Sequence, residues 1–388
     1  MDTEQKLNIL ADGSKFDLAC ACKYKDEPGR QRGAEGRWIY PASLPDGRKV
    51  FLLKTLQSNA CVNDCSYCPF NRQRDLERCT LAPENLADTF MDLLAANRVN
   101  GLFLSSGIVG TADASMERML GTVELLRRKH QFRGFVHLKI LPGASDNAIE
   151  QAVRLATRVS INIEAPSAER LAKLSGRKRF HEDIIATMRK INNFRREHGK
   201  KGKQSTQFVV GAAGESDREI VLATERLYQG YQMGRVYYSA FQTPAHTKPA
   251  PRIPNLFEDD LPLPDGKQKS WARRPSHEQE IFLREHRLYQ VDFLFRGYGF
   301  KKDDIYFDEQ GNLSLQADPK TLWAQRHPEF FPVNLNRAEK WQLLRVPGLG
   351  PIGVRRILAA RRVQRIAPST RLHDLGVRSP KLGEYICF

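Results

Sequence analysis

The stretch that decides the fold reads Ala60-Cys61-Val62-Asn63-Asp64-Cys65-Ser66-Tyr67-Cys68-Pro69. Three residues separate the first two cysteines, and two residues separate the second from the third. Thiolates this close together on one loop can converge on an iron–sulfur cluster, and soft sulfur ligands also suit zinc. A structural zinc site needs a fourth ligand, and the nearest further cysteine is Cys79. The spacing therefore predicts a metal centre at Cys61, Cys65 and Cys68 and leaves its kind open.

Short apolar runs alternate with longer amphipathic stretches around this loop. Six runs are typical of strands, at residues 50–53, 102–104, 135–141, 159–163, 207–210 and 235–239. Helical periodicity lies between them, at residues 83–97, 115–130, 146–156, 168–174, 182–198 and 217–231. Repeated β-then-α units predict an α/β protein with a parallel sheet and helices outside it. The pattern alone does not separate an open doubly wound sheet from a barrel or partial barrel.

The cysteine loop follows the first of these strands, at the end where parallel α/β proteins place their chemistry. The residue before the third cysteine, Tyr67, is aromatic. This C-x3-C-x-aromatic-C pattern after the first strand resembles the radical S-adenosylmethionine (SAM) superfamily. The resemblance implies a partial (β/α)6 TIM-like barrel and a 4Fe–4S cluster on Cys61, Cys65 and Cys68. It also implies that SAM binds the fourth iron, that Tyr67 lies near the adenine, and that a protein such as flavodoxin or ferredoxin donates electrons.

The same resemblance implies SAM contacts at the ends of three further strands. Ser-Ser-Gly follows the second strand in place of the usual Gly-Gly-Glu, an Asn-x-Glu follows the fourth, and a glycine follows the fifth. The implied contacts are Ser105, Ser106, Gly107, Asn162, Glu164 and Gly211. Each has an ordinary alternative, because Gly and Ser favour turns and Glu164 has Arg and Lys neighbours to pair with. The sequence singles out no catalytic acid or base.

The bulk composition narrows the class of protein. The net charge of +16 and the pI of about 9.6 favour polyanionic partners, nucleic acid first among them. Seven cysteines, an odd number, argue against a disulfide framework. We find no secretory signal and no run of about 18 apolar residues. We therefore expect a cytoplasmic protein that does not span a membrane, and the sequence indicates no oligomeric state.

A second motif lies near the C-terminus. The pattern predicts a helix capped by Asn336 and ending near Arg345, then a tight turn, then a helix from about Pro351. The turn consists of Pro347, Gly348, Leu349 and Gly350. This region resembles an all-α helix-hairpin-helix module, which binds the phosphate backbone of DNA. Glycines allow a phosphate to approach, the second helix offers free N–H groups, and Arg355 and Arg356 add charge. The alternative is a hairpin used for protein packing.

Together the two motifs resemble a family of radical SAM proteins assigned to DNA modification or repair. The resemblance extends to Ala11–Asp17, Arg284–Gln290 and Asn336–Ala338. We predict an N-terminal extension at 1–45, a radical SAM (β/α)6 core at 46–243, an irregular Pro-rich segment with a helix packing on the core at 244–332, and a helix-hairpin-helix DNA-binding domain at 333–388.

Three functions remain open at this point. The first is a radical SAM enzyme that forms a 5′-deoxyadenosyl radical and acts on DNA in modification or repair. The second is a DNA-binding protein whose iron–sulfur cluster, closed by Cys79, is structural or redox-sensing. The third is a radical SAM enzyme that acts on RNA or protein.

Overall fold

The computed structural model describes residues 1–14, 31–32, 38–43, 49–200, 202–242, 277–368, 372–377 and 382–388. The chain divides into two compact units. One consists of Met1–Glu215 with Arg226–Ala250, and the other of Ser216–Glu225 with Pro251–Phe388. Within the described residues, no helix has the length and apolar character that crossing a membrane requires.

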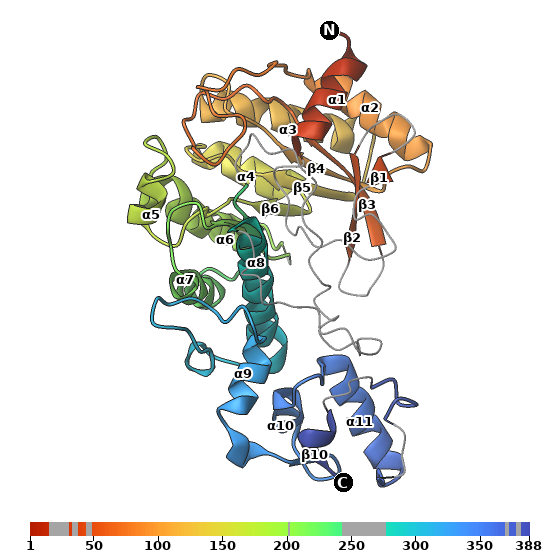
Figure 1. The fold of residues 1–388 in the computed structure, drawn as a ribbon. Helices are drawn as coiled ribbons and strands as arrows, with labels where there is room; N and C mark the ends of the chain where they lie inside the picture. The colour runs from red at the N-terminus through yellow and green to blue at the C-terminus, as the bar shows by residue number, and fades with distance from the viewer. Residues whose placement is uncertain are drawn as a thin grey trace. The chain divides into compact units, whose positions relative to one another are not determined.

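An eight-stranded sheet forms the centre of the first unit, and its strands lie in sequence order (Figure 1). The strands are β1 (Gln31–Arg32), β2 (Trp38–Ser43), β3 (Lys49–Leu56), β4 (Gly101–Ser105), β5 (Phe135–Lys139), β6 (Arg158–Ser160), β7 (Ser205–Val210) and β8 (Arg235–Ala240). All neighbouring pairs from β3 to β8 are parallel, whereas β1–β2 and β2–β3 are antiparallel. Six parallel strands thus form a half-barrel, and the predicted α/β fold, a partial TIM-like barrel, is confirmed.

Seven α-helices of the described chain lie wholly or in part in the first unit. They are α1 (Thr3–Gly13), α2 (Pro83–Ala95), α3 (Ala112–Arg128), α4 (Asp146–Leu155), α5 (Ala168–Ala172), α6 (Ala186–Glu197) and α7 (Asp217–Gly230). Local signals set their starts: Pro83 occupies the first turn of α2, and Thr111, Ser145 and Ser167 accept backbone N–H groups at their helices' N-termini. The helices α2, α3, α4 and α6 pack side by side in that order.

The sequence pattern missed α1, β1 and β2. Pro41 lies within β2 and argues against a strand, because proline lacks the N–H that a sheet ladder needs. Helix α1 buries Leu7, Leu10 and Ala11 and packs on β3, and Ser14 donates its hydroxyl to the Lys54 carbonyl at 3.0 Å. Strand β6 is shorter than predicted. Cys20, Cys22 and the Pro-rich segment at 244–275 lie outside the described residues.

The second unit is mainly helical. Besides the start of α7, it contains α8 (His277–Phe293), α9 (Pro319–Gln325), α10 (Lys340–Arg345) and α11 (Pro351–Val363). A short parallel pair that the sequence did not predict joins β9 (Val333–Asn334) to β10 (Ile386–Cys387). The apolar core of the second unit includes Leu335, Leu343, Val346, Leu349, Val354 and Ile357.

One predicted helix start in this unit is wrong. Helix α10 begins at Lys340, and Glu339 rather than Asn336 caps it, in a reciprocal arrangement with Gln342. Asn336 instead accepts the N–H of Ile366 and donates its amide to the Ile366 carbonyl, both at 2.9 Å. Its side chain therefore pins the chain beyond α11 and is not available as a helix cap.

Candidate active site

The loop between β3 and α2 carries all three predicted metal ligands. Cys65 is buried, and Cys61 and Cys68 are partly buried. One guanidinium, that of Arg78, fixes much of the loop, because it donates to the carbonyls of Asn59, Phe70, Asn71 and Arg74 at 2.7–3.0 Å. The loop is therefore a folded structure in its own right, and Arg78 is a positioning residue that sequence reasoning missed.

The end of β4 holds the first cysteine in place. The N–H of Ile108 points at the Cys61 Sγ at 3.4 Å, and the N–H of Val62 donates to the Ile108 carbonyl at 2.9 Å. Gly107 lies so close to the loop that a Cβ there would be 2.1 Å from the Ala60 carbonyl oxygen. Ser105 accepts the N–H of Gln57, and Ser106 donates to the Gly107 carbonyl. The predicted Ser-Ser-Gly segment thus braces the cysteine loop.

The surroundings of the thiols fit metal-bound thiolates. The Cys61 Sγ also accepts the N–H of Asn63 at 3.5 Å. Burial, followed by the charge of Cys65, raises the pKa of the Cys68 thiol to about 12. A bound metal deprotonates such a thiol outright, and N–H groups aimed at sulfur stabilise the resulting charge. Cys61, Cys65 and Cys68 would therefore hold an iron–sulfur cluster well.

A buried hydrogen-bonded chain connects the cysteine loop to the end of β6. Lys178 donates to the Tyr67 hydroxyl at 2.7 Å and to the Glu164 carboxylate at 3.1 Å. Asn162 donates to the other oxygen of Glu164 at 3.4 Å and accepts from Lys139. The predicted SAM contacts Tyr67, Asn162 and Glu164 are thereby brought together. The expected alternative, that Glu164 pairs with a basic neighbour, also holds, since Lys178 is that neighbour.

Sequence reasoning missed two lysines of this group, Lys139 and Lys178, and Lys178 is the one that contacts both Tyr67 and Glu164. The side chain of Lys178 is 8% exposed and that of Glu164 is 7% exposed. Burial alone would lower the pKa of Lys178, but the charges of Cys65 and Glu164 offset it and raise the pKa above its usual value. Lys178 is therefore a fixed positive charge beside the cysteines. In the sequence it is one cation in the basic run Arg177–Arg179, with nothing to mark it.

Two further contacts hold the segment that carries Lys178. Asp64, between the first two cysteines, accepts the Ser175 hydroxyl at 2.6 Å and the Gly176 N–H at 3.3 Å. The N–H of Ser66 donates to the Leu174 carbonyl at 2.8 Å. These contacts attach the residues between α5 and α6 to the cysteine loop. They thereby fix the position of Lys178, which lies in that segment.

The backbone at Glu164 has an unusual conformation. Its φ is +64°, a left-handed value that costs a non-glycine residue about 1–3 kcal/mol and is often found at functional sites. The Thr206 hydroxyl accepts the N–H of Ile163 at 2.9 Å and donates to the Ile161 carbonyl at 2.8 Å, in place of regular ladder bonds. The chain therefore leaves the regular strand geometry at Glu164, and the carboxylate of Glu164 lies against Lys178.

Gly211 has a different environment from the other predicted contacts. Its φ is +84°, and its N–H donates to the carboxylate of Glu215, which also accepts the N–H of Ala213 at 3.0 Å. Arg170 donates to the Ala213 carbonyl at 3.2 Å. This turn at the end of β7 requires glycine, and its role toward a ligand stays a prediction.

The side chain of Cys79 contacts helix α1. Its Sγ is 3.9 Å from the Lys6 carbonyl of α1, and its backbone pairs with Asn59 in both directions. Among the described residues, no three His, Cys, Asp or Glu side chains are grouped as ligands of a single metal ion. The case for a cluster rests on the loop and its hydrogen bonds, and Cys79 belongs to the contact with α1.

We predict that Lys178→Met lowers the reduction potential of the cluster. A unit charge at about 10 Å contributes roughly 1.7 kcal/mol at an effective dielectric constant of about 20, which corresponds to a fall of roughly 70 mV for one electron. Redox titration of the reconstituted protein measures this shift. Lys178→Arg keeps the charge and should restore most of the potential. Equal potentials in all three proteins would contradict an electrostatic role.

Comparison with known proteins gives a family match over the site. The sequence model of the Radical SAM superfamily matches residues 56–227, which include the cysteine loop and strands β4 to β7. The FeFe-hydrogenase maturase HydG from Carboxydothermus hydrogenoformans is 15% identical, with 63% of this chain and 52% of that chain covered and a TM-score of 0.45. Methylornithine synthase is 16% identical, with 50% and 54% covered and a TM-score of 0.40.

One curated protein is also similar in sequence. The mouse (Mus musculus) hydroxyacylglutathione hydrolase-like protein is 28% identical over 128 residues, which are 32% of this chain and 44% of that protein. The chain thus spans about half the length of the relatives it matches. The superfamily match implies a 4Fe–4S cluster and SAM, the two cofactors that the cysteine pattern predicts.

Proposed function

We propose that this radical SAM enzyme, whose superfamily domain spans residues 56–227, cleaves SAM and uses the product to modify or repair DNA. When bound and reduced, the cluster supplies the electron that splits SAM into methionine and a 5′-deoxyadenosyl radical. A protein donor such as flavodoxin or ferredoxin would supply that electron. The substrate part of the proposal rests on the hairpin between α10 and α11.

The residues of the buried chain suit the polar ends of SAM. Glu164 offers a carboxylate and Asn162 an amide, which can bind an amine or a ribose. Lys178 carries a positive charge that suits a carboxylate, and Tyr67 offers a ring for the adenine. Because Lys178 and Glu164 are almost fully buried, their charges act with little screening by solvent. In this proposal they orient SAM against the cluster.

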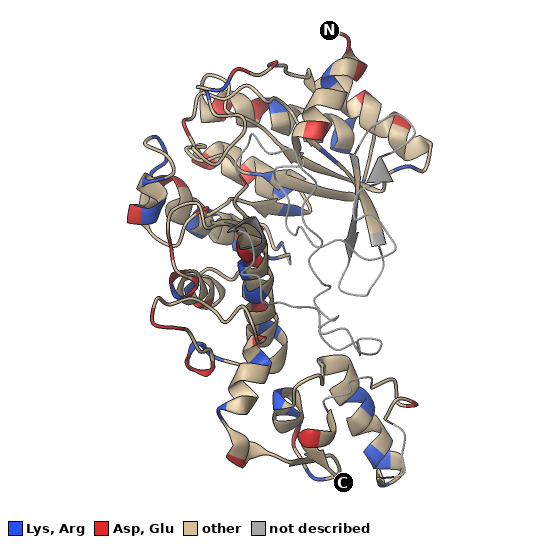
Figure 2. Ribbon diagram, in the orientation of Figure 1, with Lys and Arg blue, Asp and Glu red and all other residues tan. Residues whose placement is uncertain are grey.

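The hairpin has the features of a phosphate-binding turn. Gly348 has a φ of +73°, and Gly350 is the N-cap of α11 with no side-chain cap, so the first N–H groups of the helix are open to a ligand. The buried side chain of Lys320 donates to the Leu349 carbonyl at 2.7 Å and so fixes the turn. Leu349 itself is buried. Arginines follow along α11 (Figure 2).

The arginines of this region divide into two groups. Arg361 donates to the carbonyls of Leu335 and Ala338, and Arg356 donates to the Gly376 carbonyl at 2.9 Å. Arg355 and Arg362 are exposed. We therefore propose Arg355 and Arg362 as the main phosphate contacts among these arginines. Arg356 would contribute to phosphate binding while it also holds the turn at Gly376.

We expect the double variant Arg355→Gln/Arg362→Gln to bind duplex DNA more weakly, by a similar factor for every sequence. The log–log slope of affinity against salt should fall by about 0.9 for each phosphate that the protein no longer neutralises. Fluorescence anisotropy at several salt concentrations measures it. Arg128→Gln on α3 removes an exposed arginine elsewhere and serves as the control. A slope unchanged from the native protein would remove the hairpin from the DNA interface.

The choice of DNA has a direct test. Duplex DNA with deuterium in its sugars and bases should transfer deuterium to 5′-deoxyadenosine, which mass spectrometry detects. Transfer from deuterated RNA alone would favour the alternative of an RNA-modifying enzyme, because a hairpin of this kind senses only phosphate geometry. A purely structural cluster would give transfer from neither. The contact of the Cys79 Sγ with the Lys6 carbonyl of α1 disfavours that second alternative.

A further inference from the structure

A strongly basic pocket lies at the sheet edge opposite the cysteine loop. Its cavity has a volume of about 440 Å³. Its lining residues come just before β5, from the start of β6 and just before β7, the amino-terminal ends of these parallel strands. The cysteine loop leaves the carboxyl end of β3. Since five residues of strand span roughly 17 Å, a ligand in the pocket is separate from the cysteine site.

Cations from four segments of the chain line this pocket, which we call the basic pocket. They are Arg127 of α3, Arg133 before β5, Arg154 and Arg158 around the start of β6, and Arg195, Lys200 and Lys203 from α6 to β7. The described residues that line it include no Asp or Glu. The two acids of α4 are already paired, Asp146 with Lys190 and Glu150 with His198.

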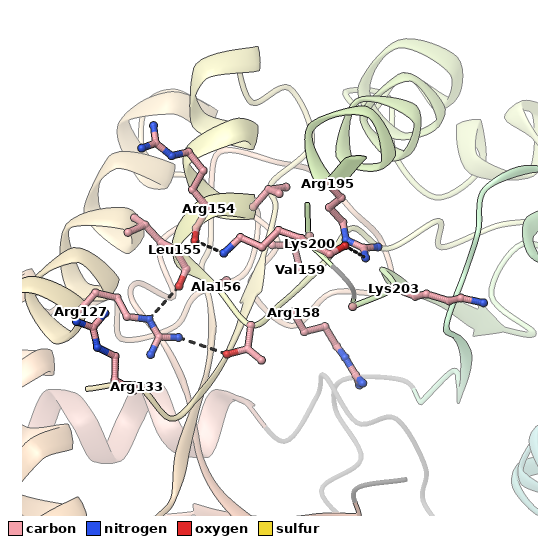
Figure 3. A pocket seen from close by; sticks show the side chains of 13 residues that line it. Arg127, Arg133, Arg154, Leu155, Ala156, Arg158, Val159, Arg195, Lys200 and Lys203 are labelled. Carbon is pink, nitrogen blue, oxygen red and sulfur yellow. Dashed lines mark hydrogen bonds between the residues drawn. The ribbon is translucent and has the colours of Figure 1, made fainter. Parts of the chain in front are cut away.

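Part of the basic pocket is a rigid floor. Arg127 donates to the carbonyls of Leu155, Phe132 and Gly134 at 2.6–2.9 Å and to the Thr157 hydroxyl at 3.3 Å. Lys200 donates to the Arg154 carbonyl at 2.8 Å. Figure 3 shows both side chains reaching the segment 154–157 from opposite sides. These bonds fix the backbone of the pocket before any ligand arrives.

Arg195 donates to the Lys200 carbonyl at 3.1 Å, and the other four cations form a rim that has no hydrogen-bond or ion-pair partner among the described residues. The side chains of Arg133, Arg154, Arg158 and Lys203 make no hydrogen bond or ion pair with any described residue, and Arg158 only lies near the Phe135 ring, 5.9 Å from its centroid. Burial, followed by the charge of Arg133, lowers the pKa of Arg127. Like charges gathered in this way destabilise the pocket until an anion neutralises them.

We infer that the basic pocket binds at least two adjacent phosphate groups of one ligand. Guanidinium groups form paired hydrogen bonds with phosphate oxygens, and several adjacent cations are matched best by a multivalent anion. The cavity is within the size range of small-molecule sites. In Figure 3 the tips of Arg154 and Arg158 point apart, and both can turn on flexible stems toward a bound anion.

Tripolyphosphate is the probe for this inference. Binding of tripolyphosphate to the full chain is measured by calorimetry at constant ionic strength, and its effect on the melting temperature is recorded. The native protein should bind and be stabilised. The affinity of Arg154→Gln/Arg158→Gln for tripolyphosphate should be lower by a factor of at least about ten, since this variant loses charge-assisted hydrogen bonds. Arg196→Gln, an exposed neighbour on α6 outside the pocket, should behave as native.

Competition then identifies the source of the phosphates. Displacement by ADP but not by a short DNA duplex indicates a free nucleotide, whereas displacement by the duplex indicates the backbone of a nucleic acid. Either result supports the pocket. No binding by the native protein, or equal binding by the double variant, overturns it. This outcome is independent of the proposed action on DNA, because tripolyphosphate binding requires neither DNA nor SAM.

Discussion

Cys65→Ala is expected to abolish cluster assembly, whereas Cys79→Ala is expected to leave it intact. Cys65 is a buried thiol in the loop that Arg78 and Asn71 hold together, and it is one of the three predicted ligands. A cluster that keeps two protein ligands is not retained. Iron content after anaerobic reconstitution should fall from about four per chain to near zero, and 5′-deoxyadenosine formation should fall with it.

The Cys79 variant is the matched control for this experiment. Both cysteines are buried and lie in the same loop, but Cys79 contacts α1. Its replacement should cost about 1 kcal/mol of stability through poorer packing, which is a shift of about 2–4 °C in the melting temperature. Loss of the cluster in Cys79→Ala would make this residue a fourth ligand and would favour a closed, structural cluster.

Gly107→Ala is expected to have the second-largest effect. The added Cβ would be 2.1 Å from the Ala60 carbonyl oxygen and 3.2 Å from the Cys61 Cβ, so the cysteine loop must move away from β4. Overpacking of this kind typically costs about 1–3 kcal/mol. The shift also removes the N–H of Ile108 from the Cys61 Sγ. We therefore expect a lower melting temperature and poor cluster loading.

Gly121→Ala provides the comparison. Gly121 is inside α3, and its added Cβ would meet only Pro83 at an ordinary 3.5 Å. Alanine in a helix interior is favoured over glycine by about 0.5–1 kcal/mol, so this variant should be slightly stabilised. Calorimetry and iron analysis of both variants separate the two effects. Normal cluster loading in Gly107→Ala would show that the brace from β4 is dispensable.

The parts of the molecule that could be predicted from sequence are those encoded locally. Cysteine spacing and short apolar runs are continuous in the chain, and they predicted the loop and the six parallel strands. The edge strand β2 was missed because Pro41 breaks its pattern. The tight turn at Gly348 and Gly350 was predicted, but the cap of α10 was misassigned because both Asn336 and Glu339 are plausible helix starts.

The parts that could not be predicted depend on contacts between distant segments. Lys178 is 111 residues from Tyr67 and looks in sequence like any surface lysine. The role of Arg78 in holding the cysteine loop follows only from its hydrogen bonds to four carbonyls in the folded structure. The basic pocket draws its cations from separate segments, each of which alone resembles a solvated charged surface. Spatial convergence, and not residue type, gives these groups their significance.

The measurement that tests the central claim most directly is the formation of 5′-deoxyadenosine. The full chain is reconstituted anaerobically with iron and sulfide, reduced with dithionite and supplied with SAM, and the product is quantified by mass spectrometry. The account predicts 5′-deoxyadenosine and methionine in equal amounts from the native protein and none from Cys65→Ala. A protein that holds an intact 4Fe–4S cluster, binds SAM and still forms no 5′-deoxyadenosine would contradict it.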